Sequence, residues 1–85
     1  MMAEKVTVSL EYPITVGGVE VKSLALRRPK VRDVVAVNKS CDSDAERELK
    51  LIANLAELAP DELEEMDVKD YVKLQAQLRV FVGRE

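Results

Sequence analysis

The chain has 85 residues, of which 47% are hydrophobic and 34% charged, and its formal net charge is −3. It contains no histidine and a single cysteine, which excludes an intrachain disulfide framework, Cys/His zinc sites and catalytic triads with an imidazole base. No apolar run approaches the ~18–20 residues of a membrane span, so no membrane partner is expected. We therefore expect one small, soluble, intracellular domain, and the lone cysteine fits a reducing cytosol.

The charged residues are distributed unevenly along the chain. Residues 1–40 hold seven Lys and Arg against four Asp and Glu, which gives +3. Residues 41–85 hold six against twelve, which gives −6. This asymmetry indicates a basic region and an acidic region, each suited to a partner of opposite sign.

Residues 5–28 have the pattern of a β-hairpin. Apolar and polar residues alternate over residues 6–12, which is the period of a half-buried strand. Gly17 and Gly18 supply a two-residue turn, because glycine readily takes a positive φ. Residues 19–26 then return as the second strand.

The register of this hairpin conflicts with its apolar pattern. A continuous register from the turn puts Leu24 and Leu26 on the face opposite to that of Leu10. Either a bulge near Pro13 or near residues 22–23 shifts one strand, or both faces are partly covered. We favour the bulge, because a proline interrupts the hydrogen-bond ladder of its own strand.

The first two helices follow the hairpin. The first is predicted over about residues 30–38. The second begins after a cap at Ser43 or Asp42, with Glu46 completing a capping box, and its apolar face extends to Ala59.

Pro60 is predicted to open a short helical turn over residues 61–66. The last helix has Asp67 as its N-cap, Asp70 where an acid helps to close the cap, and Gly83 as a left-handed C-cap. Its apolar residues at helical spacing are Tyr71, Leu74, Leu78 and Phe81. A buried stripe is the favoured interpretation of this set, and a docking face is the alternative.

These elements form one domain over residues 1–85, with the hairpin at 5–28 and a helical part at 30–83. No linker, repeat or low-complexity stretch separates them. The predicted class is α+β: an N-terminal β-hairpin packed against three or four C-terminal helices. A two-stranded hairpin is marginal by itself, and its free edges can accept another strand.

No motif predicts a metal, a cofactor or a catalytic site. The acidic segment at residues 42–46 resembles the start of a calcium loop, but Arg47 stands where the loop needs glycine and Ala53 where it needs a bidentate acid. The acids at residues 57–70 suit the first turns of helices better than a carboxylate metal site, which a metal-dependent hydrolase would need. We therefore expect a protein that is not an enzyme.

The densest basic cluster runs from Arg27 to Arg32. One interpretation is a nucleic-acid footprint. The cluster has no interleaved aromatic residues, and twelve acidic residues follow it. A solvated strand-to-helix junction, or a contact with an acidic partner, is therefore favoured.

Four segments together carry a family resemblance. They read Pro-Ile-Thr-Val-Gly-Gly at 13–18, Leu-Ala-Leu-Arg-Arg-Pro at 24–29, Leu-Ala-Pro-Asp-Glu-Leu at 58–63 and Asp-Tyr-Val-Lys-Leu-Gln at 70–75. In this order, over about residues 6–82, the chain resembles the small tail assembly chaperones of long contractile-tailed phages and Mu-like prophages.

The resemblance implies a non-catalytic protein without cofactors that acts in the cytoplasm of the bacterial host during virion assembly. Such chaperones bind the tail tape-measure protein, keep it soluble and help to recruit tail-tube subunits. They leave before the tail is complete, so they are not expected in the mature virion. In several of these phages the gene also yields a longer, frameshifted product.

Spare apolar positions on the hairpin and the last helix are candidates for holding an amphipathic client helix in a groove, with the charged segments setting its orientation. The candidate partner-binding residues are Leu24, Leu26, Arg27, Arg28, Tyr71, Leu74 and Phe81. Edge pairing leaves a homodimer or a larger ring open. The alternative function is a small prophage nucleic-acid-binding regulator that uses the cluster from Arg27 to Arg32.

Overall fold

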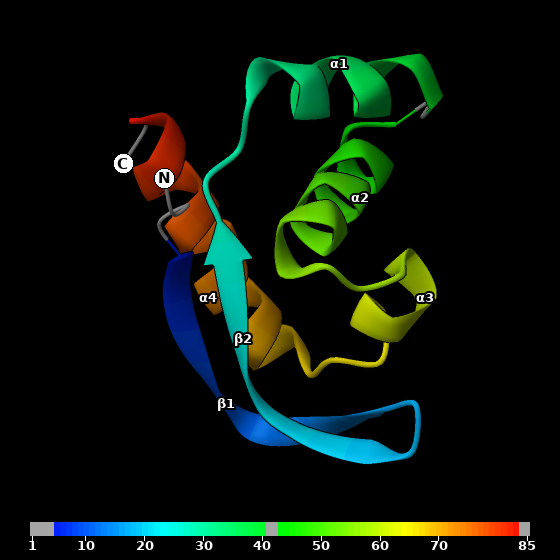
Figure 1. Ribbon diagram of the computed structural model, residues 1–85, viewed down its shortest axis with the longest axis vertical. Helices are drawn as coiled ribbons and strands as arrows, with labels where there is room; N and C mark the ends of the chain where they lie inside the picture. Colours follow the sequence, from blue (N-terminus) through cyan, green and yellow to red (C-terminus); the bar gives the residue numbers. More distant parts are fainter. Residues whose placement is uncertain (1–4, 41–42, 84–85) are drawn as a thin grey trace.

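The computed structural model describes residues 5–40 and 43–83. Within these ranges it has one two-stranded antiparallel hairpin followed by four helices, which confirms the α+β class. The elements are β1 Lys5–Val16, β2 Val19–Arg27, α1 Val31–Ser40, α2 Asp44–Ala56, α3 Pro60–Leu63 and α4 Val68–Val82. Helix α4 packs behind the hairpin, α2 lies beside it, and α1 crosses one end of α2 (Figure 1).

A bulge in β1 decides which face of the hairpin is buried. Val8 pairs with Leu24 on one side of the bulge, and Ile14 pairs with Val21 on the other. Between these pairs, residues 10–13 of β1 lie opposite Lys22 alone. The predicted bulge near Pro13 is confirmed, and it re-phases β1 so that apolar residues of both strands face the helices.

The hairpin turn forms at the two predicted glycines. Gly17 and Gly18 have φ values of 57° and 80°. Two consecutive positive φ angles are typical of a type I′ turn, whose twist matches that of the flanking strands. A side chain at either position would adopt this backbone only with strain.

Helix α2 begins at the predicted cap Ser43 but ends earlier, and of the predicted capping box the described residues show the bond accepted by Ser43 without the reciprocal bond from the Glu46 side chain. The Ser43 hydroxyl accepts a hydrogen bond from the Glu46 backbone N–H at 3.1 Å, whereas the alternative cap Asp42 lies outside the described residues. The predicted continuation to Ala59 is wrong, because Glu57 takes a left-handed conformation at φ 60°. Its N–H and that of Leu58 then bond the last carbonyls of the helix, which ends it without a glycine.

The caps of α3 and α4 lie close to the predicted positions. Pro60 is the first residue of α3, and the Glu62 carboxylate accepts a hydrogen bond from the Ala59 N–H at 2.8 Å. Asp67 caps α4 by accepting from the Lys69 N–H at 2.9 Å. Gly83 ends α4 with φ 74°. The helix termini are therefore largely determined by local sequence.

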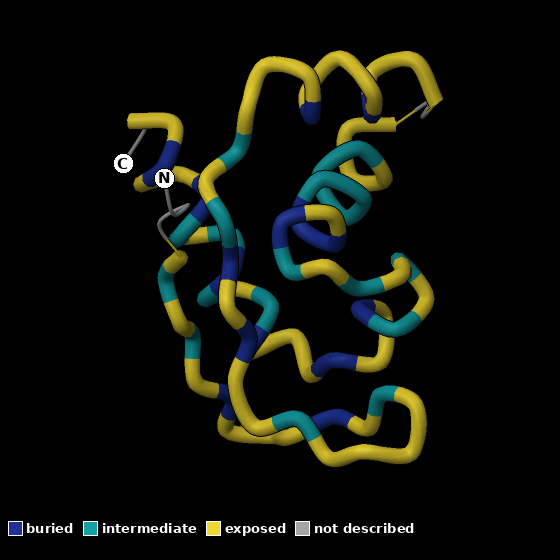
Figure 2. The backbone as a smooth tube through the Cα atoms, viewed as in Figure 1, coloured by how far each residue is buried: buried dark blue, intermediate teal, exposed yellow. Residues whose placement is uncertain are grey.

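The core lies between the inner face of the hairpin and helices α2, α3 and α4, where the buried segments of the backbone converge (Figure 2). Its members are Leu10, Ile14, Leu24, Leu26, Ile52, Ala53, Leu55, Leu63, Met66, Leu74, Leu78 and Phe81. Helix α1 contributes little to it: Val37 and Asp33 are its buried residues.

Candidate functional site

Four of the residues predicted to bind a partner belong to the core. Leu26 and Leu74 are completely buried, and Leu24 and Phe81 are exposed by less than a tenth. Tyr71 is half-buried, and burial raises the pKa of its hydroxyl to about 12, with a contribution from Glu48. Packing within the chain accounts for these apolar residues, and a docking role for them stays a prediction.

Arg27 joins the end of β2 to the start of α1. Its guanidinium donates two hydrogen bonds, each of 2.9 Å, to the two oxygens of the Asp33 carboxylate. The Lys30 N–H donates to the same carboxylate at 2.8 Å. Hydrogen bonding by Arg27, opposed by desolvation and assisted by Lys30, lowers the pKa of Asp33 to about 2. The contact with Asp33 also raises the pKa of Arg27.

Arg28 joins the same connection to the end of α4. Its guanidinium lies 5.2 Å from the centre of the Phe81 ring and donates to the Phe81 carbonyl at 3.3 Å. A cation over an aromatic face is attracted by the ring quadrupole. Two arginines of the basic cluster thus make contacts within the chain, and Lys30 and Arg32 are its remaining exposed cations.

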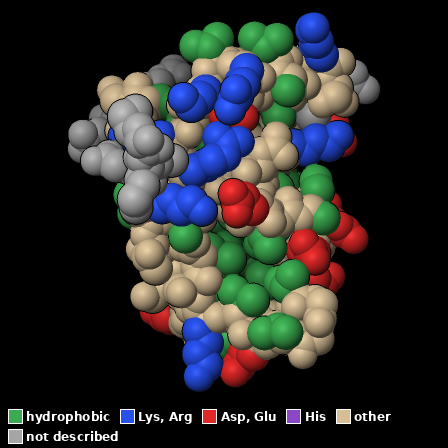
Figure 3. All heavy atoms as spheres, in the orientation of Figure 1, with side chains coloured by type: hydrophobic (Ala, Val, Ile, Leu, Met, Phe, Trp, Pro, Cys, Tyr) green, Lys and Arg blue, Asp and Glu red, His purple; other side chains and the backbone are tan. Residues whose placement is uncertain are grey.

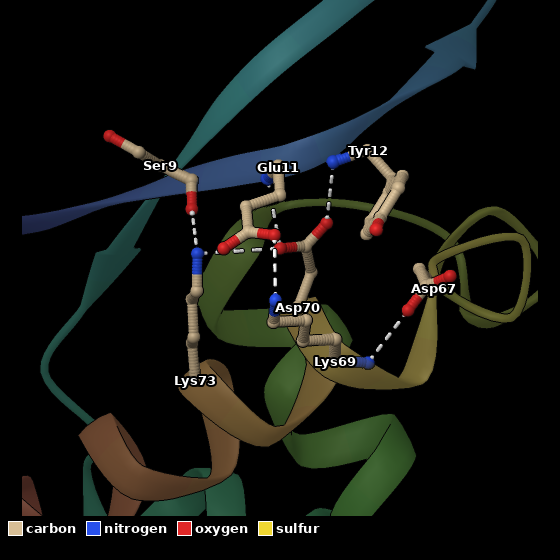
Figure 4. Close-up of polar contacts among 7 residues, drawn as sticks. All are labelled: Ser9, Glu11, Tyr12, Asp67, Lys69, Asp70 and Lys73. Carbon is tan, nitrogen blue, oxygen red and sulfur yellow. Dashed lines mark hydrogen bonds and ion pairs between the residues drawn. The ribbon is translucent and has the colours of Figure 1, made fainter.

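Asp70 does not close the cap of α4, and that prediction is wrong. The Asp70 side chain points to the bulge of β1 (Figure 4). Its two carboxylate oxygens accept from the backbone N–H groups of Glu11, at 2.9 Å, and Tyr12, at 3.0 Å. The Asp70 side chain is completely buried. It therefore supplies the hydrogen bonds that the bulged strand cannot obtain from β2.

Two lysines of α4 form ion pairs beside the bulge, one with Asp70 and one with Glu11. The Lys73 ammonium lies 3.5 Å from Asp70 and donates to the Ser9 carbonyl at 3.2 Å, and the Lys69 ammonium lies 2.9 Å from the Glu11 carboxylate (Figure 4). Burial raises the pKa of Asp70, but the two N–H donors and Lys73 outweigh burial and lower it. The carboxylate is therefore held in its charged form.

The sequence contains a signal for this buried carboxylate. Asp70 lies four residues before Leu74 and eight before Leu78, so all three occupy one face of α4. That face is the buried one. The position of Asp70 in the first turn of α4 suggested a cap, whereas its place on the apolar stripe indicated burial.

Helices α1, α2 and α4 enclose an open groove of about 530 Å³. Its lining residues are Val34, Glu48, Leu51, Leu78, Arg79 and Val82. The Glu48 carboxylate accepts from the Gln75 side-chain amide at 2.7 Å, so it already has a partner. A smaller pocket of about 150 Å³ lies beside α3 and includes Leu63 and Tyr71.

Exposed valines are concentrated on two helices. They are Val31, Val34 and Val35 on α1, and Val68, Val72, Val80 and Val82 on α4. The acids of these two helices, Asp33 and Asp70, are buried. The other charged residues of α1 and α4 are Arg32, Lys39, Lys69, Lys73 and Arg79. Both helices therefore combine exposed valines with basic side chains.

Acidic residues lie elsewhere on the surface. Figure 3 shows Lys and Arg side chains gathered around α1 and the connection that leads to it, and acidic side chains at the edge near α2 and α3. The same face shows apolar side chains between the hairpin and the helices. The basic and acidic surfaces thus follow the tertiary structure and not the two halves of the chain, because α4 belongs to the acidic half.

Among residues 5–40 and 43–83, no group of three or more Cys, Asp and Glu residues is arranged to hold a metal ion. In the same part of the chain, no helix has both the length and the apolar character required to cross a membrane.

Comparison with known proteins identifies the family. No curated protein and no solved structure matches the chain. The family model described as phage tail assembly chaperone proteins, E, or 41 or 14, matches residues 7–83. This match runs from the third residue of β1 to the cap of α4, and so covers most of β1, all of β2 and all four described helices. The chain therefore belongs to this phage tail assembly chaperone family and has a role in phage tail assembly.

Proposed function

We propose that this protein is a non-catalytic chaperone that binds the tail tape-measure protein and helps to recruit tail-tube subunits around it. It acts in the cytoplasm of the bacterial host and leaves before the virion is complete. The observation that carries this proposal is the family match over residues 7–83. We propose the tape-measure protein as the client because the sequence resembles chaperones that bind such a protein.

The surface supports a role in binding another protein. Valines are exposed on α1 and α4, and a groove lined by both apolar and charged side chains lies between these helices and α2. Exposed apolar surface that is grouped and bordered by polar residues is typical of protein–protein contact sites. Binding would remove this surface from water and favour a complex by the hydrophobic effect.

Co-expression with the tape-measure protein of the same phage tests the proposal. We expect the client to be insoluble when expressed alone and to co-elute with the chaperone in size-exclusion chromatography. An unrelated small acidic protein at the same expression level is the control for non-specific solubilisation. A client that stays insoluble beside a well-folded chaperone contradicts the proposal.

Recruitment of tail-tube subunits has its own test. Purified tube subunits are added to the chaperone–client complex and to the same quantity of free chaperone. We expect tube assembly, followed by electron microscopy, only where the complex is present, with the chaperone released into the supernatant. Equal assembly with and without the complex would limit the function to client binding.

A further inference from the structure

The groove between α1, α2 and α4 is open because α1 is weakly anchored. Helix α1 packs on α2, and its buried side chains are Val37 and Asp33. Val34 of α1 and Val82 of α4 therefore remain 41% and 47% exposed on the two sides of the groove. Leu51 of α2 lies between these helices in the same lining. The result is a concave surface built from three elements, in which apolar side chains lie beside the charged Glu48 and Arg79.

The charged side chains of the groove lining are one carboxylate, that of Glu48, and one guanidinium, that of Arg79. The Glu48 carboxylate already accepts from the Gln75 amide, whereas the exposed Arg79 guanidinium has no ion pair or hydrogen bond among the described residues. The exposed cations Lys30 and Arg32 lie at the start of α1, and Arg28 lies against the end of α4. A ligand in the groove therefore encounters exposed valines and, in Arg79, a guanidinium that is available for an ion pair.

These observations determine the chemistry of the occupant. We propose that the groove binds an amphipathic helix of the client, whose apolar stripe is bordered by Asp or Glu, and that Arg79 pairs with one of these carboxylates. The inference rests on the proposed function and assigns it a contact surface. An apolar helix face in a groove supplies affinity, and charge complementarity supplies orientation and association rate.

A second copy of this chain is a poorer occupant. The other charged residues of α1 and α4 are basic, so two copies that meet through these helices would bring like charges together. Helix α2 carries acids, but its apolar residues Ile52, Ala53 and Leu55 are already in the core. None of these three helices offers an exposed apolar face bordered by acids.

The apolar part of the inference is tested with Val34→Asp and Val82→Asp. Both positions are exposed, so we expect the variants to fold with a Tm near that of the wild type. The client segment used is the one that the wild-type chaperone protects from proteolysis in the complex. Each variant should bind this segment with an affinity about tenfold or more below that of the wild type. The matched control is Val19→Asp, because Val19 is 64% exposed at the hairpin turn, and it should leave the affinity unchanged.

The charge part is tested with Arg79→Glu, with Lys22→Glu as the matched control on the hairpin. Arg79→Glu should weaken client binding by about three- to tenfold at low salt, and less at high salt, because salt screens the pair. A Glu→Lys substitution in the client segment should restore binding to Arg79→Glu. Lys22→Glu should have no such effect.

The outcomes separate this inference from the proposed function. If no complex forms with the wild type, the proposed function fails. If the wild type binds and the three groove variants bind equally well, the function stands and the groove is overturned as the docking site. A third outcome is salt-sensitive binding of the protein to a DNA duplex, weakened by Arg79→Glu but not by Val34→Asp. This outcome would also overturn the groove as a docking site for a client helix, in favour of nucleic acid.

Discussion

Helices α1 and α4 each carry an aspartate as their third residue, and the two carboxylates hold the fold in different ways. Asp33 accepts from Lys30 in its own helix cap and from Arg27, six positions away. Asp70 accepts from backbone N–H groups of β1 that lie 59 and 58 positions away. The same residue type at the same helical position thus makes a local brace in one case and a long-range clamp in the other.

The difference follows from burial and from the donors available. Arg27 is a quarter exposed, so the brace on α1 is partly screened by solvent. Asp70 is completely buried, and its main partners are backbone groups that the bulge leaves without a strand partner. A buried charge without its hydrogen bonds is costly, so α4 and β1 should separate only when the fold opens. Helix α1 should be able to loosen first.

Asp70→Ala should have the largest effect. It leaves the Glu11 and Tyr12 N–H groups without an acceptor and removes a buried side chain. We expect the Tm to fall by on the order of 10–20 °C. Thermal unfolding followed by circular dichroism measures this, with Asp61→Ala, an exposed first-turn acid of α3, as the control. A fall of only a few degrees would contradict a major stabilising role for the hydrogen bonds between Asp70 and β1.

The brace on α1 should be measurable as a coupling between its partners. Arg27→Ala, Asp33→Ala and the double variant form a double-mutant cycle. Because Asp33 is nearly buried and the pair is bidentate, we expect a coupling free energy of about 2 kcal/mol in urea unfolding. Lys5 and Glu57, an exposed pair at 3.9 Å, provide the control cycle, with a coupling close to zero. Equal coupling free energies in the two cycles would contradict a stabilising role for the Arg27–Asp33 ion pair.

The pKa of Asp33 predicts how stability depends on pH. Its value in the folded protein, about 2, is below the ordinary value of 3.8, so its stabilisation is complete above pH ~4. We expect about 1–2 kcal/mol of the free energy of unfolding to be lost as the pH falls from about 4 to 2. Asp33→Asn should reduce this loss.

The pKa of Asp70 is also lowered, so some acid sensitivity should remain in Asp33→Asn. Urea unfolding at several pH values between about 2 and 6 measures both contributions. If wild type and Asp33→Asn lose stability equally over this window, Asp33 is not the titrating group.

Lys73→Ala should have the smallest effect on stability. It tests whether Asp70 depends on its backbone donors or on the nearby lysine. Lys73 lies near Asp70 and is partly exposed, but the two backbone donors of Asp70 stay in place. We expect the free energy of unfolding to fall by about 0.5–1 kcal/mol. A loss as large as that of Asp70→Ala would mean that the clamp depends on the lysine. Lys50→Ala on α2 is the control for removing a lysine.

Local sequence signals predicted much of the fold. Gly17 and Gly18 indicated the turn, Ser43 and Asp67 the caps, and Gly83 the end of the last helix, since each acts on its immediate neighbours. Glu57 shows the limit of such signals. Nothing in its residue type predicts a left-handed conformation. In the folded chain this conformation lets the Glu57 and Leu58 N–H groups bond the last carbonyls of α2.

The candidate site was less predictable than the elements. Apolar residues at helical spacing indicated that α4 has a buried face, but Val68, Val72 and Val80 of the same helix are exposed. Several docking candidates proved to be core residues, and the groove uses Val34, Leu51 and Val82 from three different helices. Periodicity within one element does not show which elements enclose a groove.

By itself, the amino-acid sequence determined the hairpin, the order of the elements, most helix caps and the family resemblance, because these depend on neighbouring residues and on motif order. Only the tertiary structure decided that Asp70 binds the bulge of β1 and that Val34 of α1, Leu51 of α2 and Arg79 of α4 line one groove. The physical reason is distance along the chain: such contacts join residues tens of positions apart, and packing alone selects their partners.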